Sequence, residues 1–186
     1  MCLKIKIIII GLLFFSQFGF SQNRYFTKTG TIYFMSHTDA IDIDGTNKQV
    51  VSFLDIKTGE MVFGVLVKSF EFTLATASEH FNETYMETHL YPKASFKGII
   101  KDIQKIDFSK PGKYDVVVEG SLTIHGVTKE VSEKGTLDVK ENEIEASSSF
   151  QVSINDYKIT VPKLVEARVA KIVDVKVNLT YKPYQK

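Results

Sequence analysis

Apolar and polar residues alternate along most of the chain after residue 30, which is the pattern of half-buried β-strands. The clearest case is 171–181, where Val173, Val175, Val177 and Leu179 share one face and polar or charged residues occupy the positions between them. Shorter segments rich in β-branched and aromatic residues precede it. The pattern predicts strands over 31–35, 61–74, 94–100, 114–124, 136–139, 146–154 and 171–181.

The long run 61–74 changes phase in its middle. Phe63 and its alternating neighbours share one face in the first half, whereas Phe70 and Phe72 share the opposite face in the second half. Because side chains alternate strictly along a strand, one extra residue moves every later side chain to the other face. The sequence therefore predicts a bulge or a bend near Lys68.

Segment 76–92 lacks the alternation of a strand. Thr76 is followed three residues later by Glu79, which is the spacing of a capping box at the start of a helix. Pro92 ends any helix that begins there. We therefore expect one short helix in this segment, and we expect it to close one end of the β structure.

Two aromatic residues of the expected helix, Phe81 and Tyr85, are four positions apart and so lie on one helical face. We expect this face to turn inward, against the strands. A second helical turn is predicted over 165–169.

Turn signals separate the predicted strands and fall at 44–47, 57–59, 110–112, 141–142 and 155–156. Short strands at this spacing indicate an all-β antiparallel structure, either a barrel or a sandwich. The chain has 186 residues, of which 44% are hydrophobic, and no internal repeat or linker divides it. We therefore expect a single domain over 22–186.

The first 21 residues have the layout of a secretory signal peptide. Lys4 and Lys6 precede an apolar run over 7–15, and 19–21 places small residues at the two positions that a signal peptidase reads. A membrane anchor is the alternative, but the run is shorter than the roughly 20 apolar residues that a bilayer span needs. We expect cleavage before Gln22, and a periplasmic or secreted protein without a membrane span.

Cleavage changes the charge and the thiol content. The formal charge of +1 becomes −1 because Lys4 and Lys6 leave without any acidic residue, and the only cysteine, Cys2, leaves with them. The mature chain then has no disulfide, no cysteine–metal site and no cysteine nucleophile. A net charge so close to zero argues against nucleic acid as a partner.

The stretch 120-GSLTIHGVTKEV-131 is the strongest candidate for special chemistry, because a histidine stands beside a glycine where a strand breaks. Folding can bring distant metal ligands together, but no two of the four histidines have the HxH or HxxxH spacing of a metal site; they are His37, His80, His89 and His125. Ser121 lies about 13 Å from His125 along a strand, too far for a nucleophile–base pair. The sequence favours a structural role, in which His125 and Gly126 form a turn and the imidazole bonds local backbone.

Charged residues after this turn indicate a hairpin that faces solvent. We expect them on its outer face and in its turn; they are Glu130, Glu133, Lys134, Asp138, Lys140, Glu141, Glu143 and Glu145. No pair of carboxylates is isolated within an apolar run, where a raised pKa would suit acid–base catalysis. The sequence also lacks a glycine-rich phosphate loop. We therefore predict no catalytic residues, no metal and no cofactor.

Large apolar residues at alternating strand positions leave two interpretations open. They fill the interior of a packed core, or they line a barrel wide enough to hold one small ligand, a size that barrels of about eight strands reach. Alternation along a strand is the same in both cases. The residue pattern alone therefore does not distinguish a filled barrel from a hollow one.

Two segments resemble the markers of the YceI-like family of secreted or periplasmic bacterial proteins. Segment 120–129, GSLTIHGVTK, looks like the signature hairpin of that family. Segment 80–96 is similar to a second marker, in which a helical segment is followed by Tyr91-Pro92 and by a strand that carries Phe96. The order and spacing of both agree with the family, and the resemblance covers 29–182.

The resemblance implies a lipocalin-like antiparallel barrel of about eight strands, with one or two short helices closing its ends and an elongated apolar interior. Family members hold polyisoprenoid or other amphiphilic chains there. The resemblance therefore implies a long apolar or amphiphilic ligand such as an isoprenoid, a quinone or a fatty-acyl lipid. The hairpin after Lys129 is more charged than is usual in the family, which indicates a shallower or partly filled cavity.

On this interpretation the protein binds a ligand and is not an enzyme. The side chains expected to line the interior are Phe63, Phe70, Phe72, Phe81, Tyr85, Phe96, Leu122, Ile124, Phe150 and Val152. The alternative is a structural or interaction protein with a filled barrel that acts through its surface. A hydrolase of envelope lipids is a third class, which the missing cysteine and the missing His–Ser pair disfavour.

Overall fold

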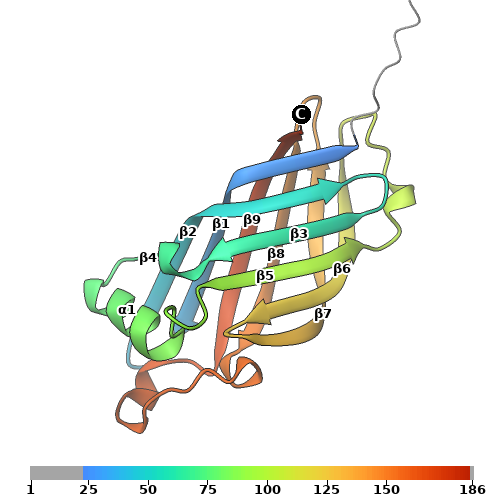
Figure 1. Cartoon of the computed structure of the whole chain (residues 1–186). Coiled ribbons are helices and arrows are strands. Elements are labelled where there is room, and N and C mark those ends of the chain that lie inside the picture. The colour runs from blue at the N-terminus through green and yellow to red at the C-terminus, as the bar shows by residue number, and fades with distance from the viewer. Residues whose placement is uncertain (1–22, 185–186) are drawn as a thin grey trace, which may run out of the picture.

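Eight antiparallel strands close into a barrel in the computed structural model, which describes residues 23–184 (Figure 1). The expected signal peptide lies outside the described residues. Around the barrel the order is β1-β9-β8-β7-β6-β5-β3-β2, and pairing of β1 with β2 closes the ring. The strands are β1 (Arg24–His37), β2 (Asp42–Asp55), β3 (Glu60–Leu66), β5 (Lys93–Ile100), β6 (Gly112–Ile124), β7 (Val127–Val139), β8 (Ile144–Ser153) and β9 (Ile172–Pro183). The predicted all-β antiparallel barrel is confirmed.

The phase change in the run 61–74 marks a point where the strand is interrupted. Strand β3 ends at Leu66, a 3₁₀ turn follows over Val67–Ser69, and the two-residue strand β4 (Glu71–Phe72) pairs with β2 outside the ring. Phe63 therefore points into the barrel from β3, whereas Phe72 lies opposite Gly45 on β2. The predicted bend near Lys68 is confirmed.

Helical segments gather mainly at one end of the barrel. They are α1 (Ala75–His80), which continues into the π-helical turn Phe81–Tyr85, and the 3₁₀ turns Ile154–Tyr157 and Lys163–Arg168. A further 3₁₀ turn, Ile103–Lys105, lies at the opposite end, between β5 and β6. None of the helices in the described part of the chain is long and apolar enough to cross a membrane.

The expected capping box is wrong. Leu74 occupies the N-cap position of α1, and no side chain caps the helix, so Thr76 lies inside the first turn. The helix itself is present where the sequence predicted one. The helical turn expected over 165–169 is also present, as the 3₁₀ segment Lys163–Arg168.

The turn expected at 44–47 is also wrong, because these residues lie within β2. Gly45 pairs with Phe34 across the β1–β2 ladder, and a Cβ atom at Gly45 would lie 2.5 Å from the Phe34 ring. The glycine is therefore needed for the close approach of an aromatic ring and not for a turn. The chain passes from β1 to β2 earlier, at 38–41.

One half of the barrel is packed solid, and we call it the filled end. Its core is made by Val50, Leu54, Ile100, Leu137, Ile144 and Tyr181, each at most 2% exposed. The Tyr181 hydroxyl lies 2.6 Å from Ser52 Oγ, which in turn donates a 2.8 Å hydrogen bond to the Val62 carbonyl. Both hydroxyl groups are thereby satisfied in an apolar interior.

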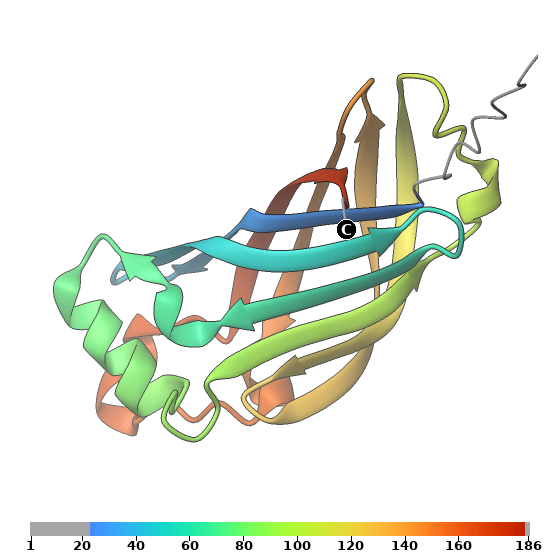
Figure 2. The same ribbon diagram turned by 45° about the horizontal axis from the view of Figure 1, so that its top comes forward.

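The opposite half carries α1 and the segment 154–171, and we call it the mouth end. Figure 2 shows these two segments side by side at one end of the barrel, whereas the first and last described strands, β1 and β9, bring both ends of the described chain to the filled end. Every strand of the ring thus runs from a solid core to an end covered by short helices. The candidate site lies at the mouth end.

Candidate functional site

The mouth end encloses an apolar cavity of about 350 Å³, which we call the mouth cavity. Strands β1, β2, β3, β5, β6, β8 and β9 supply its walls, and α1 with the turns Phe81–Tyr85 and Lys163–Arg168 supplies its rim. Apart from five residues the lining is apolar; the five are Ser36, Thr76, His80, Tyr85 and Arg168. A cavity of this size and composition is typical of sites for small apolar ligands.

Phe34, Phe70 and Phe81 line one side of the mouth cavity, and Phe72 packs against Phe34 and Phe81. Phe81 lies between 4.9 and 5.6 Å, centroid to centroid, from the rings of Phe34, Phe70 and Phe72. Phe34 also contacts Phe70 and Phe72 edge-on. Because these rings come from β1, β4 and the segment after α1, their packing fixes the helical cover over the opening.

A second space of about 120 Å³, which we call the inner bay, lies between the mouth cavity and the filled end. Five residues line both spaces, which are therefore adjacent; they are Ile32, Val65, Leu122, Phe150 and Val177. Gly98 and Gly120 face each other across β5 and β6, and the ring of Phe96 lies over Gly98. Gly98 thus leaves room for the Phe96 ring, whose centroid is 5.8 Å from that of Phe63.

The residues that the sequence named as lining fall into three groups. Seven line the mouth cavity: Phe70, Phe81, Tyr85, Leu122, Ile124, Phe150 and Val152. Phe63 and Phe96 line the inner bay, which Leu122 and Phe150 also reach. Phe72 lines neither space and packs instead against Phe34 and Phe81. Contact of any of them with a ligand stays a prediction.

Sequence reasoning missed a large part of the wall. Ile32 and Phe34 on β1, and Val173 and Val175 on β9, line the mouth cavity. All four lie at alternating positions of strands that the sequence predicted, so the sequence pattern did indicate that they share an inward face. The curvature that brings β1 and β9 together cannot be read from alternation, because it depends on the closure of the barrel.

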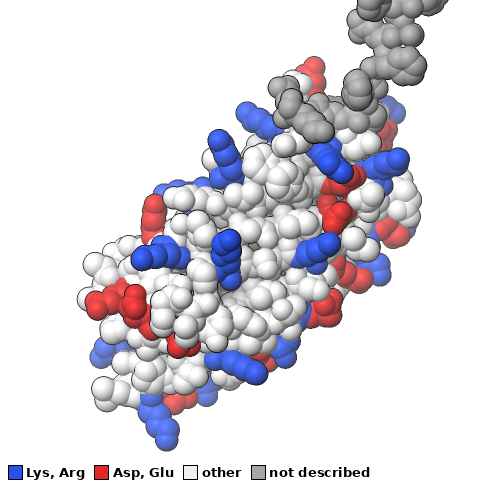
Figure 3. Space-filling model, viewed as in Figure 1, with Lys and Arg blue, Asp and Glu red and all other residues white. Residues whose placement is uncertain are grey.

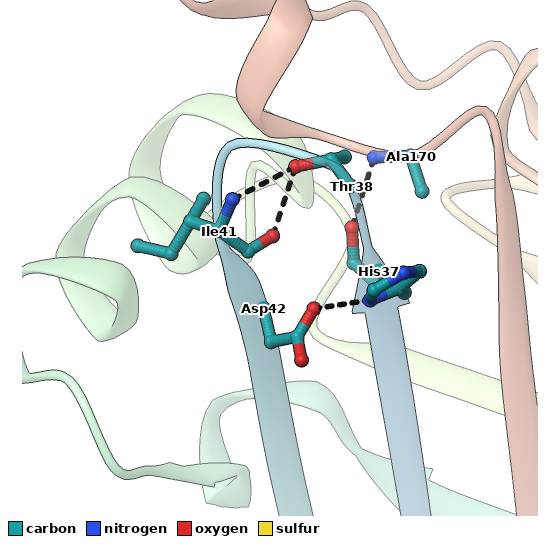
Figure 4. Close-up of polar contacts among 6 residues, drawn as sticks. His37, Thr38, Ile41, Asp42 and Ala170 are labelled. Atoms are coloured by element: carbon teal, nitrogen blue, oxygen red, sulfur yellow. Dashed lines mark hydrogen bonds and ion pairs between the residues drawn. The ribbon is translucent and has the colours of Figure 1, made fainter.

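Hydrogen bonds hold the rim in place between β1 and β2 (Figure 4). Thr38 Oγ1 donates to the Ile41 carbonyl and accepts from its amide, and His37 Nδ1 lies 2.5 Å from an oxygen of Asp42. Ser36 Oγ accepts a 2.9 Å hydrogen bond from the Ala170 amide. Ser36 thereby ties the segment after the turn Lys163–Arg168 to the wall of the mouth cavity.

His125 has a structural position, as predicted, but its contacts differ from the prediction. His125 (φ 50°) and Gly126 (φ 71°) form the two-residue loop between β6 and β7, a geometry typical of a type I′ turn. The imidazole does not bond local backbone. Its Nδ1 lies 3.2 Å from the Tyr157 carbonyl and its Nε2 lies 2.9 Å from Glu87 Oε2, so it joins the turn to two distant segments.

The expectation that all the charged residues of the β6–β7–β8 hairpins face solvent is wrong for Glu133. Glu133 pairs with Val118 on β6 and shares the inward face of β7 with Val131 and Leu137. Its side chain lines the inner bay. Burial raises the pKa of its carboxyl group above the usual value. A strand with two faces places every second residue inward, and Glu133 occupies such a position.

No group of three His, Cys, Asp or Glu side chains within residues 23–184 is arranged to hold a metal ion. Lysine, arginine and acidic side chains are interspersed over the face shown in Figure 3, and no large area of one sign gathers there. Burial raises the pKa of the Tyr85 hydroxyl at the rim, so this group stays neutral. The geometry thus presents an apolar enclosure with a few polar groups, most of them at its entrance.

Known structures share this fold. A polyisoprenoid binding domain from Saccharophagus degradans implicated in plant cell wall breakdown superposes with a TM-score of 0.75 at 14% identity, covering 87% of this chain and 99% of that one. Burkholderia cenocepacia BcnA gives a TM-score of 0.68 at 17% identity, covering 81% and 95%. The Campylobacter jejuni YceI protein gives 0.55 at 13% identity, covering 99% and 92%. A comparison with curated proteins finds no match.

The sequence profile of the YceI-like domain matches residues 18–181. This match covers most of the chain, and the barrel described above has the fold of the solved relatives. The protein therefore belongs to the YceI-like family, and the family assignment made from the two sequence segments is confirmed.

Proposed function

We propose that this protein is a binding protein that holds a polyisoprenoid or another amphiphilic lipid inside its barrel, and that it performs no chemistry. The observation that carries the proposal is the apolar space formed by the mouth cavity and the inner bay, which opens at the end covered by short helices. The similarity to a polyisoprenoid binding domain supports the same ligand class.

The lining has the properties that a flexible hydrocarbon chain requires. Its side chains are mostly half-buried, as Phe34, Phe70, Phe81 and Phe150 are, so the chain itself leaves apolar surface uncovered. Each methylene group that a ligand buries there contributes roughly 0.8 kcal/mol. Tyr85 and Arg168 lie at the entrance, so the walls of the mouth cavity below them are almost wholly apolar.

We further propose that the protein acts in the periplasm or outside the cell, after removal of the first 21 residues. The sequence pattern of those residues is the support for this location. A role without catalysis is supported by the lining itself, in which the charged or polar groups do not form a nucleophile–base pair. A filled barrel that acts through its surface is the alternative outcome of the test.

Native mass spectrometry tests the proposal on protein purified from the secreted or periplasmic fraction of cells that express the full chain. We expect one co-purifying isoprenoid or fatty-acyl species per chain, released by organic extraction. A mass equal to the chain alone, unchanged after incubation with polyprenyl and quinone lipids, would contradict the proposal and favour a surface role.

Two aspartate variants of β6 make a matched pair for this test. Leu122→Asp places a carboxylate in the wall shared by both spaces, and we expect it to abolish the bound species. Thr123→Asp adds the same group on the opposite face of the strand, next to Thr128. This control should keep the ligand. Loss of ligand from both variants would show that an aspartate on either face of β6 disrupts the barrel.

A further inference from the structure

Glu133 is an acidic side chain in the wall of the inner bay, whose other lining residues are apolar except for Ser148. Glu133 lies two residues beyond the last pair of the β7–β8 ladder, which runs from Val139 with Ile144 to Gly135 with Ser148. On the other side it pairs with Val118 of β6. Both Val118 and Glu133 line the inner bay. The register of the barrel, and not chance orientation of a flexible side chain, therefore directs this carboxyl group inward.

The surroundings of Glu133 offer its carboxyl group no partner. Within residues 23–184 it makes no hydrogen bond and no ion pair, and desolvation is the only influence that raises its pKa. The other polar residue of the bay, Ser148, already donates its hydroxyl hydrogen to the Lys134 carbonyl. The charge of Glu133 contributes to the raised pKa of the Tyr157 hydroxyl, after the larger effects of burial and of Asp156.

A hydrocarbon chain that fills the bay would remove the remaining water from Glu133. A carboxylate without water and without a donor is strongly disfavoured in an apolar environment. A ligand that brings its own hydrogen-bond donor avoids this cost, because a hydrogen bond to a charged acceptor is stronger than one between neutral groups. The wall thus discriminates against a purely hydrocarbon segment at this depth.

We propose that Glu133 determines the ligand class, and that the barrel selects an amphiphile whose apolar chain carries a hydrogen-bond donor, such as an amine or a hydroxyl group, held at the Glu133 carboxyl. This inference rests on the proposed function, since it assigns a chemical group to the ligand of the same cavity. It places the donor in the inner bay and the remaining chain in the mouth cavity.

Three compounds with the same isoprenoid chain test the assignment: farnesylamine, farnesol and farnesyl methyl ether. Displacement of Nile red from the delipidated full-length protein gives an affinity for each. We expect the amine to bind about tenfold or more tightly than the ether, with the alcohol between them, because one charge-assisted hydrogen bond separates the two extremes. In the Glu133→Leu variant the preference of the amine over the ether should disappear, because the amine would then lack an acceptor in an apolar space.

Glu130→Leu is the matched control. Glu130 is the neighbouring acid on β7, faces outward and accepts a hydrogen bond from Ser121. Its variant should keep the order amine, alcohol, ether. If Glu133→Leu also binds the three compounds in the order amine, alcohol, ether, and circular dichroism shows an intact fold, Glu133 does not recognise the donor group and the inference is overturned.

The same measurements separate the two proposals. Binding of all three compounds with equal affinity in the parent protein overturns the role of Glu133 and leaves the lipid-binding function standing. Failure of every compound and of Nile red to bind overturns the proposed function itself, and the inference with it. A preference for the amine that disappears only in Glu133→Leu supports both.

Discussion

At the filled end of the barrel Leu137 and Tyr181 are at most 1% exposed, whereas at the mouth end Phe34, Phe81 and Phe150 remain half-buried around a cavity. The same strands run through both ends, and the same alternation of inward and outward residues continues along them. What differs is the closure. The filled end is closed by the barrel's own side chains, and the mouth end is covered by short helices that leave space beneath them.

This difference separates stability from binding along one set of strands. A fully buried aliphatic side chain touches neighbours on all sides, so its loss leaves a cavity. A side chain that lines an existing cavity lacks neighbours on one side and therefore contributes less to folding. The filled end should therefore supply most of the folding stability. Side chains at the mouth end can differ with the ligand at a smaller cost in stability.

The largest effect expected from this comparison is that of Leu137→Ala at the filled end. Leu137 is 1% exposed and belongs to the main core, so the substitution should lower the free energy of unfolding by about 2–5 kcal/mol. Urea unfolding followed by circular dichroism measures this change. The lipid content per folded chain should stay the same.

Val152→Ala at the mouth end is the counterpart. Val152 lines the mouth cavity and is only partly buried, so the loss should be about 1 kcal/mol or less. Equal losses in the two variants would mean that the mouth end is packed as tightly as the filled end, and the comparison would fail.

Seven of the eight barrel strands were predicted at least in part, because alternation records which face of a strand is buried, but β2 (Asp42–Asp55) was missed. Leu122, Ile124 and Phe150 were placed inward from this signal, and the structure puts them in the wall. Alternation identifies the face of a residue but not its depth. Leu137 lies in the core and Phe150 in the cavity wall because the two ends of the barrel close differently. This closure depends on contacts between residues far apart in the sequence.

Two of the errors of sequence interpretation have a common physical cause. Gly45 was read as a turn residue and Glu133 as a surface residue, each from the ordinary preference of its residue type. In the structure a neighbouring ring requires the glycine, and the strand register directs the glutamate inward. In both places tertiary context overrides local preference. Parity along β7 would have placed Glu133 correctly, since Leu137 is an even number of residues away.

The buried hydroxyl pair gives the next largest effect and sharpens the description of the filled end. Ser52→Ala removes the partner of the Tyr181 hydroxyl and should destabilise the protein by about 1–3 kcal/mol, because a buried polar group is left unsatisfied. Burial raises the pKa of Tyr181 far enough that the group remains a neutral donor. The midpoint of urea unfolding reports the loss.

Tyr181→Phe is the milder partner of this test. It leaves the hydrogen bond from Ser52 to the Val62 carbonyl in place, so the loss should be about 0.5–1.5 kcal/mol. If Tyr181→Phe were the more damaging of the two, the hydroxyl pair would not be the reason for the burial of Ser52.

His125→Asn probes the mouth end, where contacts between segments replace a solid core. Asparagine tolerates the positive φ of the turn, but it cannot reach both Glu87 and Tyr157. We expect a loss of about 1 kcal/mol, since the Glu87 side chain that the imidazole contacts is 40% exposed and water competes for this contact. Amide hydrogen exchange should become faster in α1 and in 154–160, and it should stay unchanged at Leu137 and Tyr181. Uniform acceleration throughout the barrel would show that His125 supports the whole fold and not the cover alone.

The smallest effect lies between the two ends, at Glu133, and it depends on pH. Desolvation raises the pKa of Glu133 in the folded protein above its usual value of 4.5, so the folded chain retains this proton over a pH range in which the unfolded chain releases it. Below that range both states are protonated and the group has no effect. As the pH rises through the raised pKa, the folded state loses stability relative to the unfolded state. Glu133→Gln removes this loss, so the variant should melt at the same temperature as the parent near pH 4 and at a higher temperature near pH 7. Thermal unfolding of both proteins across this range gives the difference directly, and a constant difference at all pH values would place the Glu133 carboxyl in water and not in the wall of the inner bay.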